Sequence, residues 1–232
     1  MKTRMIFFFS VAALMLLLTH PSFAQQLHPK LEKKEKTIRN VLILPAKVGL
    51  TKSGMKGSEG MLKESDQVAV ELPKLVVAAL EKKGYTVMVA PFNSPTLDDS
   101  SDLKFALSDV QNRYDVLGQQ LFRKQKDVKK GRFTLGDEVS KVNPDGKADT
   151  LVFIRAAGNK NTGGKKALGV LLTNPFMIVD VMIVSISLVD AQSGEVLAIT
   201  QAAGIGDFVN KTEKSLAKGI EKALKKLPAP AK

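Results

Sequence analysis

The stretch 184–200, VSISLVDAQSGEVLAIT, reads as two apolar strands joined by a turn, and it constrains the fold more than any other part of the chain. Residues up to Val189 alternate between the two faces of a strand. Asp190 can accept backbone N–H groups in the turn, and Gly194 can adopt a positive φ. Turn geometry therefore accounts for Asp190 and Glu195, which we do not interpret as a pair of catalytic acids.

Other apolar patterns alternate between strands and helices. We expect strands over residues 37–46, 85–91, 148–156, 176–190 and 195–203, and helices over residues 68–80, 103–121, 134–142 and 210–227. Pro73 either kinks the first helix or marks a start near Glu71. Residues 49–60 are expected to form a loop. The sequence thus predicts an α/β fold with a mixed sheet of about five strands flanked by helices.

Residues 1–24 have the pattern of a cleavable signal peptide. A positively charged start precedes an apolar segment over residues 5–18, and Ser22-Phe23-Ala24 fits a small-x-small cleavage site. The apolar segment is shorter than the roughly 20 residues that a membrane-spanning helix needs. We therefore expect cleavage after Ala24 and an exported mature chain that begins at Gln25.

The mature chain has 208 residues (232 minus 24), which is enough for one domain. Residues 25–36 are charged and lack an apolar period, so they are expected to form a flexible tether. Residues 37–227 are predicted to form a single α/β domain. Residues 228–232 are expected to be a disordered tail.

The chain has no cysteine and only two histidines, His20 in the signal peptide and His28 in the charged segment that follows it. A Ser-His-Asp triad, a Cys-His pair and a His/Cys zinc site are therefore excluded. Lipoprotein acylation, which requires a cysteine, is excluded as well. Residues 158–166 do not fit a phosphate-binding loop, because Gly164 stands where that motif has its lysine and no Ser or Thr follows Lys165. We predict a mobile basic surface loop there, and neither a cofactor nor a metal.

The formal net charge is +12, and the mature chain keeps +10 because two cations lie in the signal peptide. Such a charge favours binding to anionic phospholipid, lipopolysaccharide or acidic polysaccharide. Alternatively, its only role is to keep the protein soluble. Nucleic acid is not expected, because the chain is exported, lacks Trp and has only two Tyr.

A basic segment, RKQKDVKKGR at residues 123–132, is one candidate interaction surface for anionic lipid or glycan. Alternatively, its cations complement the negative end of a helix dipole. The candidate residues are Arg123, Lys124, Lys126, Lys129 and Lys130.

The most hydrophobic stretch of the mature chain, residues 167–179, supplies the second candidate surface. A membrane span would have to continue through Asp180, which a bilayer disfavours. Either the stretch packs in the core, or it forms an exposed apolar knob that docks on a membrane or a partner. The knob would consist of Leu168, Val170, Leu171 and Leu172 beside Lys165 and Lys166. Asp180 is expected to pair with Arg155 or to lie in solvent.

Four stretches together resemble a known family: RNVLILPAKV, LEKKGYTVMVAP, KADTLVFIRAAG and VSISLVDAQSGEVLAIT. With the terminal amphipathic helix, they are similar to the periplasmic α/β domain shared by the curli-secretion protein CsgG, the N-terminal domain of TolB, and the envelope proteins LpoB and PelC. The resemblance covers most of residues 37–227. It implies a non-enzymatic envelope scaffold, secretion component or partner of an envelope machine. Many members are lipoproteins, from which this chain departs.

We therefore expect a soluble, non-lipidated periplasmic protein without enzymatic activity. It would bind an envelope component through its basic face and residues 158–175. A protein is the expected partner; an anionic membrane surface or a glycan, and oligomerisation, stay open. The alternative functions are a carboxylate-dependent enzyme acting on envelope glycans and an oligomeric secretion accessory.

Overall fold

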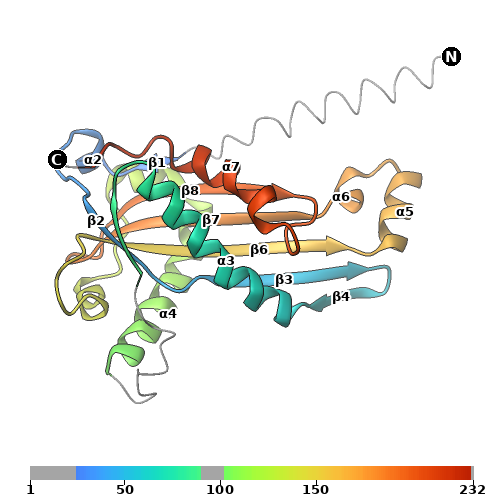
Figure 1. The fold of residues 1–232 in the computed structure, drawn as a ribbon, viewed down its shortest axis with the longest axis horizontal. Coiled ribbons are helices and arrows are strands. Elements are labelled where there is room, and N and C mark those ends of the chain that lie inside the picture. The colour runs from blue at the N-terminus through green and yellow to red at the C-terminus, as the bar shows by residue number, and fades with distance from the viewer. Residues whose placement is uncertain (1–24, 90–101, 231–232) are drawn as a thin grey trace.

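The computed structural model describes residues 25–89 and 102–230, which form a long sheet with helices on both faces (Figure 1). The strands are β1 (Gln26–Leu27), β2 (Asn40–Ile43), β3 (Lys47–Gly54), β4 (Gly57–Gly60), β5 (Thr86–Val89), β6 (Thr150–Asn161), β7 (Val181–Asp190) and β8 (Val196–Ile205). The predicted mixed α/β fold is confirmed, with eight strands in place of about five. The predicted signal peptide lies outside the described residues.

Strand β6 joins the parallel and antiparallel parts of the sheet. On one side it pairs in parallel with β2 through residues 150–152 and with β3 through residues 155–161. On the other side it pairs with antiparallel β7 from Thr150↔Asp190 to Asn159↔Val181. The order across the sheet is β1-β8-β7-β6-β2-β5, with β4 paired to β3. The predicted mixed sheet thus has parallel pairs among β2, β5 and β6 and an antiparallel hairpin of β7 and β8.

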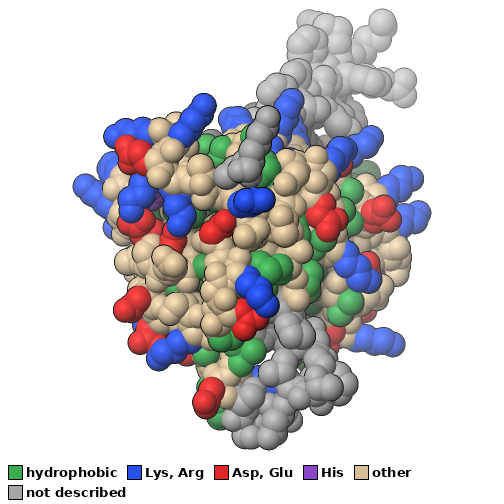
Figure 2. Space-filling view, turned by 60° about the vertical axis from the view of Figure 1, so that its left-hand side comes forward, with side chains coloured by type: hydrophobic (Ala, Val, Ile, Leu, Met, Phe, Trp, Pro, Cys, Tyr) green, Lys and Arg blue, Asp and Glu red, His purple; other side chains and the backbone are tan. Residues whose placement is uncertain are grey.

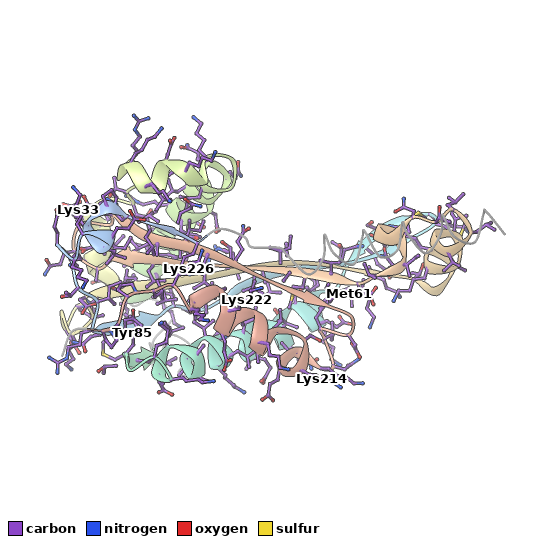
Figure 3. All side chains as sticks on the ribbon, turned by 90° about the horizontal axis from the view of Figure 1, so that it is seen from above. Lys33, Met61, Tyr85, Lys214, Lys222 and Lys226 are labelled. Atoms are coloured by element: carbon purple, nitrogen blue, oxygen red, sulfur yellow. The ribbon has the colours of Figure 1, made fainter. Side chains whose placement is uncertain are left out.

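The sheet separates two hydrophobic cores, with α3 (Leu62–Glu81) and α7 (Thr212–Leu224) on one face and α4 (Asp102–Arg123) on the other (Figures 1 and 3). Neighbouring residues of β6 enter different cores, because side chains alternate along a strand. Ile154 packs in the core under α3 and α7, and Phe153 packs in the core under α4. Pro73 lies within the continuous helix α3, so of the two alternatives for this residue, the start near Glu71 is wrong.

Five short helical segments complete the fold. These are α2 (Pro29–Glu32), α5 (Gly163–Leu171), α6 (Pro175–Ile178) and two 3-10 helices, η1 (Gln125–Lys130) and η2 (Asp137–Val142). Helix η2 occupies the place of the short helix predicted over residues 134–142.

Residues 26–32 form β1 and α2, where the sequence predicted a flexible tether over residues 25–36. Strand β1 pairs with β8, and the backbone N–H of His28 donates to Leu197 O at 2.8 Å. The His28 Nδ1 atom accepts from Lys30 N and caps α2, and Leu31 is only 3% exposed. One buried leucine and one cap are too short a pattern to be recognised in a charged sequence.

Residues 47–60 form the hairpin of β3 and β4, where the sequence predicted a loop. Leu50 is the buried apolar side chain of β3, and its backbone N–H donates to Ser65 Oγ at 3.0 Å. The neighbouring positions are mostly Gly, Lys, Thr and Ser, so the strand lacks an alternating apolar signal. Its ladder with β6 supplies the backbone hydrogen bonds that fix it as a strand.

The C-terminal segment is also packed further than predicted. Leu227 is buried, and the Tyr85 hydroxyl donates a hydrogen bond to Pro228 O. Burial raises the pKa of Tyr85 to about 12. Residues 228–230 therefore lie within the described structure, and residues 231–232 of the predicted tail lie outside it.

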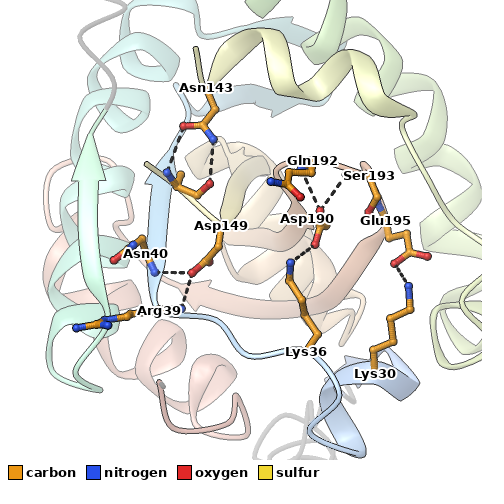
Figure 4. Close-up of polar contacts among 11 residues, drawn as sticks. Lys30, Lys36, Arg39, Asn40, Asn143, Asp149, Asp190, Gln192, Ser193 and Glu195 are labelled. Atoms are coloured by element: carbon orange, nitrogen blue, oxygen red, sulfur yellow. Dashed lines mark hydrogen bonds and ion pairs between the residues drawn. The ribbon is translucent and has the colours of Figure 1, made fainter. Parts of the chain in front are cut away.

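The turn between β7 and β8 has the chemistry that the sequence predicted (Figure 4). Asp190 Oδ1 accepts from the backbone N–H groups of Gln192 and Ser193 at 3.0 and 2.9 Å, and Gly194 has a φ of +70°. The other Asp190 oxygen pairs with Lys36. Burial acts to raise the pKa of Asp190, but these hydrogen bonds outweigh it and hold that pKa below its ordinary value.

We predict that Gly194→Ala lowers the free energy of unfolding by about 3 kcal/mol, through backbone strain and overpacking together. An added Cβ would lie 2.2 Å from Gly136 O. Gly146→Ala is the matched control, because Gly146 also has a positive φ but nothing within 4 Å of the added Cβ. It should cost only about 1 kcal/mol. Urea unfolding checks both values, and equal losses would contradict the packing assigned to Gly194.

Asp190→Asn should lower the free energy of unfolding by about 1–3 kcal/mol at neutral pH. Because the folded pKa of Asp190 is depressed, its contribution is present above the ordinary carboxyl pKa and is lost as the pH falls through the folded value. The difference in free energy of unfolding between Asp190→Asn and the native chain should therefore shrink below about pH 4. Asp145→Asn, at an exposed carboxylate, is the control. A difference that does not change with pH would count against this role.

Candidate docking surface

Helices α5 and α6 form a tip at one end of the sheet, beyond the ends of β6 and β7 (Figures 1 and 3). Helix α5 begins directly after β6, where Thr162 Oγ1 accepts from Lys165 N at 3.4 Å. Gly169 allows α5 to lie close to α6, since a Cβ there would be 2.7 Å from Met177 Cβ. Thr162 N–H donates to Ser53 O at 2.9 Å, which holds the tip against the β3–β4 hairpin.

This geometry corrects the loop predicted over residues 158–175. Residues up to Asn161 belong to β6, and most of the remainder forms α5 and the start of α6. Gly158 resembles a loop residue in the sequence, but it is needed for packing inside the sheet. A Cβ there would lie 2.7 Å from Leu50 Cδ2 and 3.2 Å from a ring carbon of Phe208.

The apolar residues at the end of α5 face solvent. Val170, Leu171 and Leu172 are 61%, 78% and 58% exposed, whereas Leu168 is half-buried. Thr173, the next residue, has a φ of +52°, a strained conformation for a β-branched residue. These three side chains are therefore exposed, as the knob alternative predicted, and are not packed in the core. Binding by the knob remains a prediction.

The two lysines of the tip differ in their contacts. Lys166 Nζ lies 2.8 Å from Asp180 Oδ2, and Asp180 is only 6% exposed. Asp180 Oδ1 also accepts from Asn161 N–H at 2.7 Å. Lys166 therefore has a structural partner in a buried carboxylate, while Lys165 is half-buried at the start of α5.

The predicted pair of Asp180 and Arg155 is wrong. The antiparallel register places Arg155 opposite Ser185, well inside β7, whereas Asp180 precedes that strand. Arg155 Nε instead lies 2.7 Å from Asp115 Oδ1 on α4, and its guanidinium stacks over Tyr114. The sequence does not show that β7 begins after Asp180, and this start is what separates Asp180 from Arg155.

The contact of Arg155 with α4 borders a cavity of about 200 Å³, which sequence reasoning missed. Its walls include Tyr114, Asp115, Arg155 and Ser185. Burial acts to raise the pKa of Asp115, but hydrogen bonds from Lys47 and Arg155 outweigh it and lower that pKa. An arginine within an apolar strand was the one sequence signal for a polar contact here.

The basic segment after α4 lies apart from the tip. Helix η1 contacts β1 and β8, whereas α5 contacts α6 and β3. The candidate residues of this segment with exposed side chains are Lys124, Lys126, Lys129 and Lys130, and the side chain of Arg123 lies outside the described part. Lys130 pairs with Asp127 at 3.1 Å. On the face shown in Figure 2, cations are scattered among carboxylates. The two predicted surfaces therefore do not form one site.

Within residues 25–89 and 102–230, no group of three or more His, Cys, Asp or Glu side chains is placed to hold a metal ion. Hydrogen bonds from Asn210 lower the pKa of the exposed Asp207 carboxyl, as other contacts do at Asp115 and Asp190. A general acid needs the opposite shift. No helix in this part of the chain is long and apolar enough to cross a membrane.

Comparisons with protein-family models and with curated proteins found no match. Among solved structures, the chain is similar to a PelC dodecamer from Paraburkholderia phytofirmans, with 11% identity over 89% of this chain and 96% of that chain and a TM-score of 0.41. It is also similar to lipoprotein GNA1162 from Neisseria meningitidis, with 11% identity over 71% of this chain and 78% of that chain and a TM-score of 0.32. A third similar structure is the LpoB C-terminal domain from Salmonella enterica, with 14% identity over 76% of this chain and 94% of that chain and a TM-score of 0.26. PelC and LpoB also appear in the sequence resemblance. With TM-scores below 0.5, these likenesses carry no conclusion about activity or partners.

We predict that Lys166→Gln lowers the free energy of unfolding by about 1–3 kcal/mol, because it removes the cation from a buried carboxylate. Lys165→Gln, one residue earlier on the same helix, should change it by less than about 0.5 kcal/mol. Thermal unfolding of the two variants beside the native chain checks the difference. Equal stabilities of the two variants would contradict the structural role of Lys166.

Proposed function

We propose that this chain is an exported, non-enzymatic accessory protein of the cell envelope that binds an envelope component through the tip of α5. The signal-peptide pattern of residues 1–24 supports export, and the absence of cysteine supports a soluble periplasmic form without a lipid anchor.

The observation that carries this proposal is the run of three exposed apolar side chains from Val170 to Leu172. Clustered apolar side chains at a surface favour burial against a partner or a membrane interface. The strained backbone at Thr173 directly follows the run. Strain of this kind persists where the surrounding structure enforces it, and it is often found at binding sites.

The tip also lies apart from the helices that cover the two hydrophobic cores. Helix α5 contacts α6 and β3, whereas the cores are formed by α3, α4 and α7 against the sheet. A substitution among the exposed residues of α5 therefore removes binding surface without opening a cavity. This separation makes the proposal testable, because loss of binding and loss of stability can be distinguished.

We predict that Leu171→Ser together with Leu172→Ser weakens association with the envelope fraction at least about tenfold. Burying one leucine contributes about 1.5–3 kcal/mol, and about 1.4 kcal/mol corresponds to a factor of ten in affinity. The free energy of unfolding should change by less than about 1 kcal/mol, because both side chains are exposed. Co-sedimentation with native envelope fragments, with and without their proteins, measures the association and separates a protein partner from a lipid surface.

The matched control is Leu62→Ser, because Leu62 is 79% exposed at the start of α3 and does not belong to α5 or α6. It should leave association unchanged. Full association of the double variant, or an equal loss in the control, would overturn the docking role of the tip. A soluble wild-type protein that never sediments with either preparation would overturn it as well.

A further inference from the structure

Helix α5 exposes its uncharged side to solvent. None of its exposed residues carries a charge, and those that share one side at helical spacing are Gly163, Gly164, Ala167 and Leu171. Gly169, on the opposite side, is buried against α6. A surface helix of a globular protein normally turns its polar side to water and its apolar side to the core. In α5 this pattern is reversed, so covering the exposed side would be favourable.

The turn of the β3–β4 hairpin extends this apolar surface beyond the start of α5. Met55 is 69% exposed, and its Sδ atom lies 3.7 Å from the position that a Cβ would take on Gly164. The hairpin turn and α5 lie at the same end of the sheet, and α5 runs across the direction of the strands (Figure 1). The tip therefore presents the length of one helix side, with Met55 near one end and Leu171 near the other.

Positive charge borders this apolar surface. The sequence from residue 150 to residue 179 contains one arginine and three lysines but no acidic residue. Lys165 lies on the same side of α5 as Leu168 and Leu172, and Lys56 follows Met55 in the hairpin turn. Within the described part of the chain, the side chains of Lys56 and Lys165 form no ion pair.

The acids that neighbour the tip do not cancel this charge. Each of them lies near at least one lysine: Glu59 is 3.4 Å from Lys52, Asp180 is 2.8 Å from Lys166, and Asp207 is close to Lys160 and Lys211. The charges of Lys56 and Lys165 are therefore left over, and they attract an anionic occupant.

We propose that the tip docks on an anionic phospholipid surface, an inference that rests on the docking role proposed above. The exposed side of α5 and Met55 enter the boundary between the head groups and the acyl chains, as the apolar sides of interfacial helices do. Lys56 and Lys165 hold their ammonium groups at the level of the lipid phosphates. An acidic polysaccharide would pair with these lysines but would leave the leucines in water.

Tryptophan fluorescence tests this docking directly, because the chain has no tryptophan. Leu171→Trp places one reporter on the exposed side of α5, and Leu62→Trp places one at the equally exposed start of α3. Both variants are exported by the native host, purified, and mixed with vesicles of phosphatidylcholine that contain or lack phosphatidylglycerol. With phosphatidylglycerol, the Leu171→Trp emission should shift to shorter wavelength, and the Leu62→Trp emission should not. No shift at position 171, or equal shifts at both positions, would overturn the proposal.

The role of charge is tested by the double variant Lys56→Gln with Lys165→Gln. Its binding to the phosphatidylglycerol vesicles, measured by co-sedimentation, should be weaker at least about tenfold, because two cations near the lipid phosphates are lost. Lys126→Gln with Lys129→Gln is the matched control, since it removes the same charge from exposed positions of the basic segment after α4. An equal loss in both double variants would show that binding follows net charge alone, and it would contradict docking through the tip.

The outcomes separate this inference from the proposed function. A protein that associates with envelope fragments only when they carry their proteins, and not with phosphatidylglycerol vesicles, overturns the lipid surface and leaves the docking role of the tip intact. A protein that associates with neither overturns both.

Discussion

The antiparallel ladder between β6 and β7 is the interaction on which the rest of the structure depends. Its pairs run without a break from Thr150↔Asp190 to Asn159↔Val181. At one end it places the turn beside the N-terminal segment, where Lys36 pairs with Asp190 and Lys30 pairs with Glu195. At the other end it extends beyond the helical layers and supports α5 and α6. The ladder thus sets the distance between the well-packed part of the molecule and its exposed tip.

This arrangement explains why similar residues have different roles at the two ends. Asp190 and Glu195 are held by lysines from a segment that closes the sheet, so these acids stabilise a turn. At the tip, Lys166 holds the buried Asp180, whereas the neighbouring leucines have no covering layer. The charge of this lysine is therefore used within the fold, and the apolar side chains are what the tip exposes to solvent.

The sequence was sufficient to predict an element where the pattern of neighbouring residues alone determines its structure. The apolar stripes of α3, α4 and α7 and the turn at Asp190 and Gly194 were predicted, because periodicity and turn chemistry act over a few residues. Strands β1 and β3 were missed because partner strands, more than their own side chains, fix them. The pairing of Asp180 with Lys166 was also missed, because it depends on where β7 begins. For Leu171 the sequence left two alternatives, exposure at the surface and packing in the core, because a hydrophobic stretch alone fits both.

Photo-crosslinking in the native host tests the central claim, that the tip of α5 contacts an envelope component. A photoreactive amino acid would replace Leu171 in one variant and Leu62 in another, since both residues are strongly exposed but lie on different elements. The account predicts a discrete cross-linked product from position 171 and none from position 62. Absence of a product at position 171, or the same products at both positions, would contradict it.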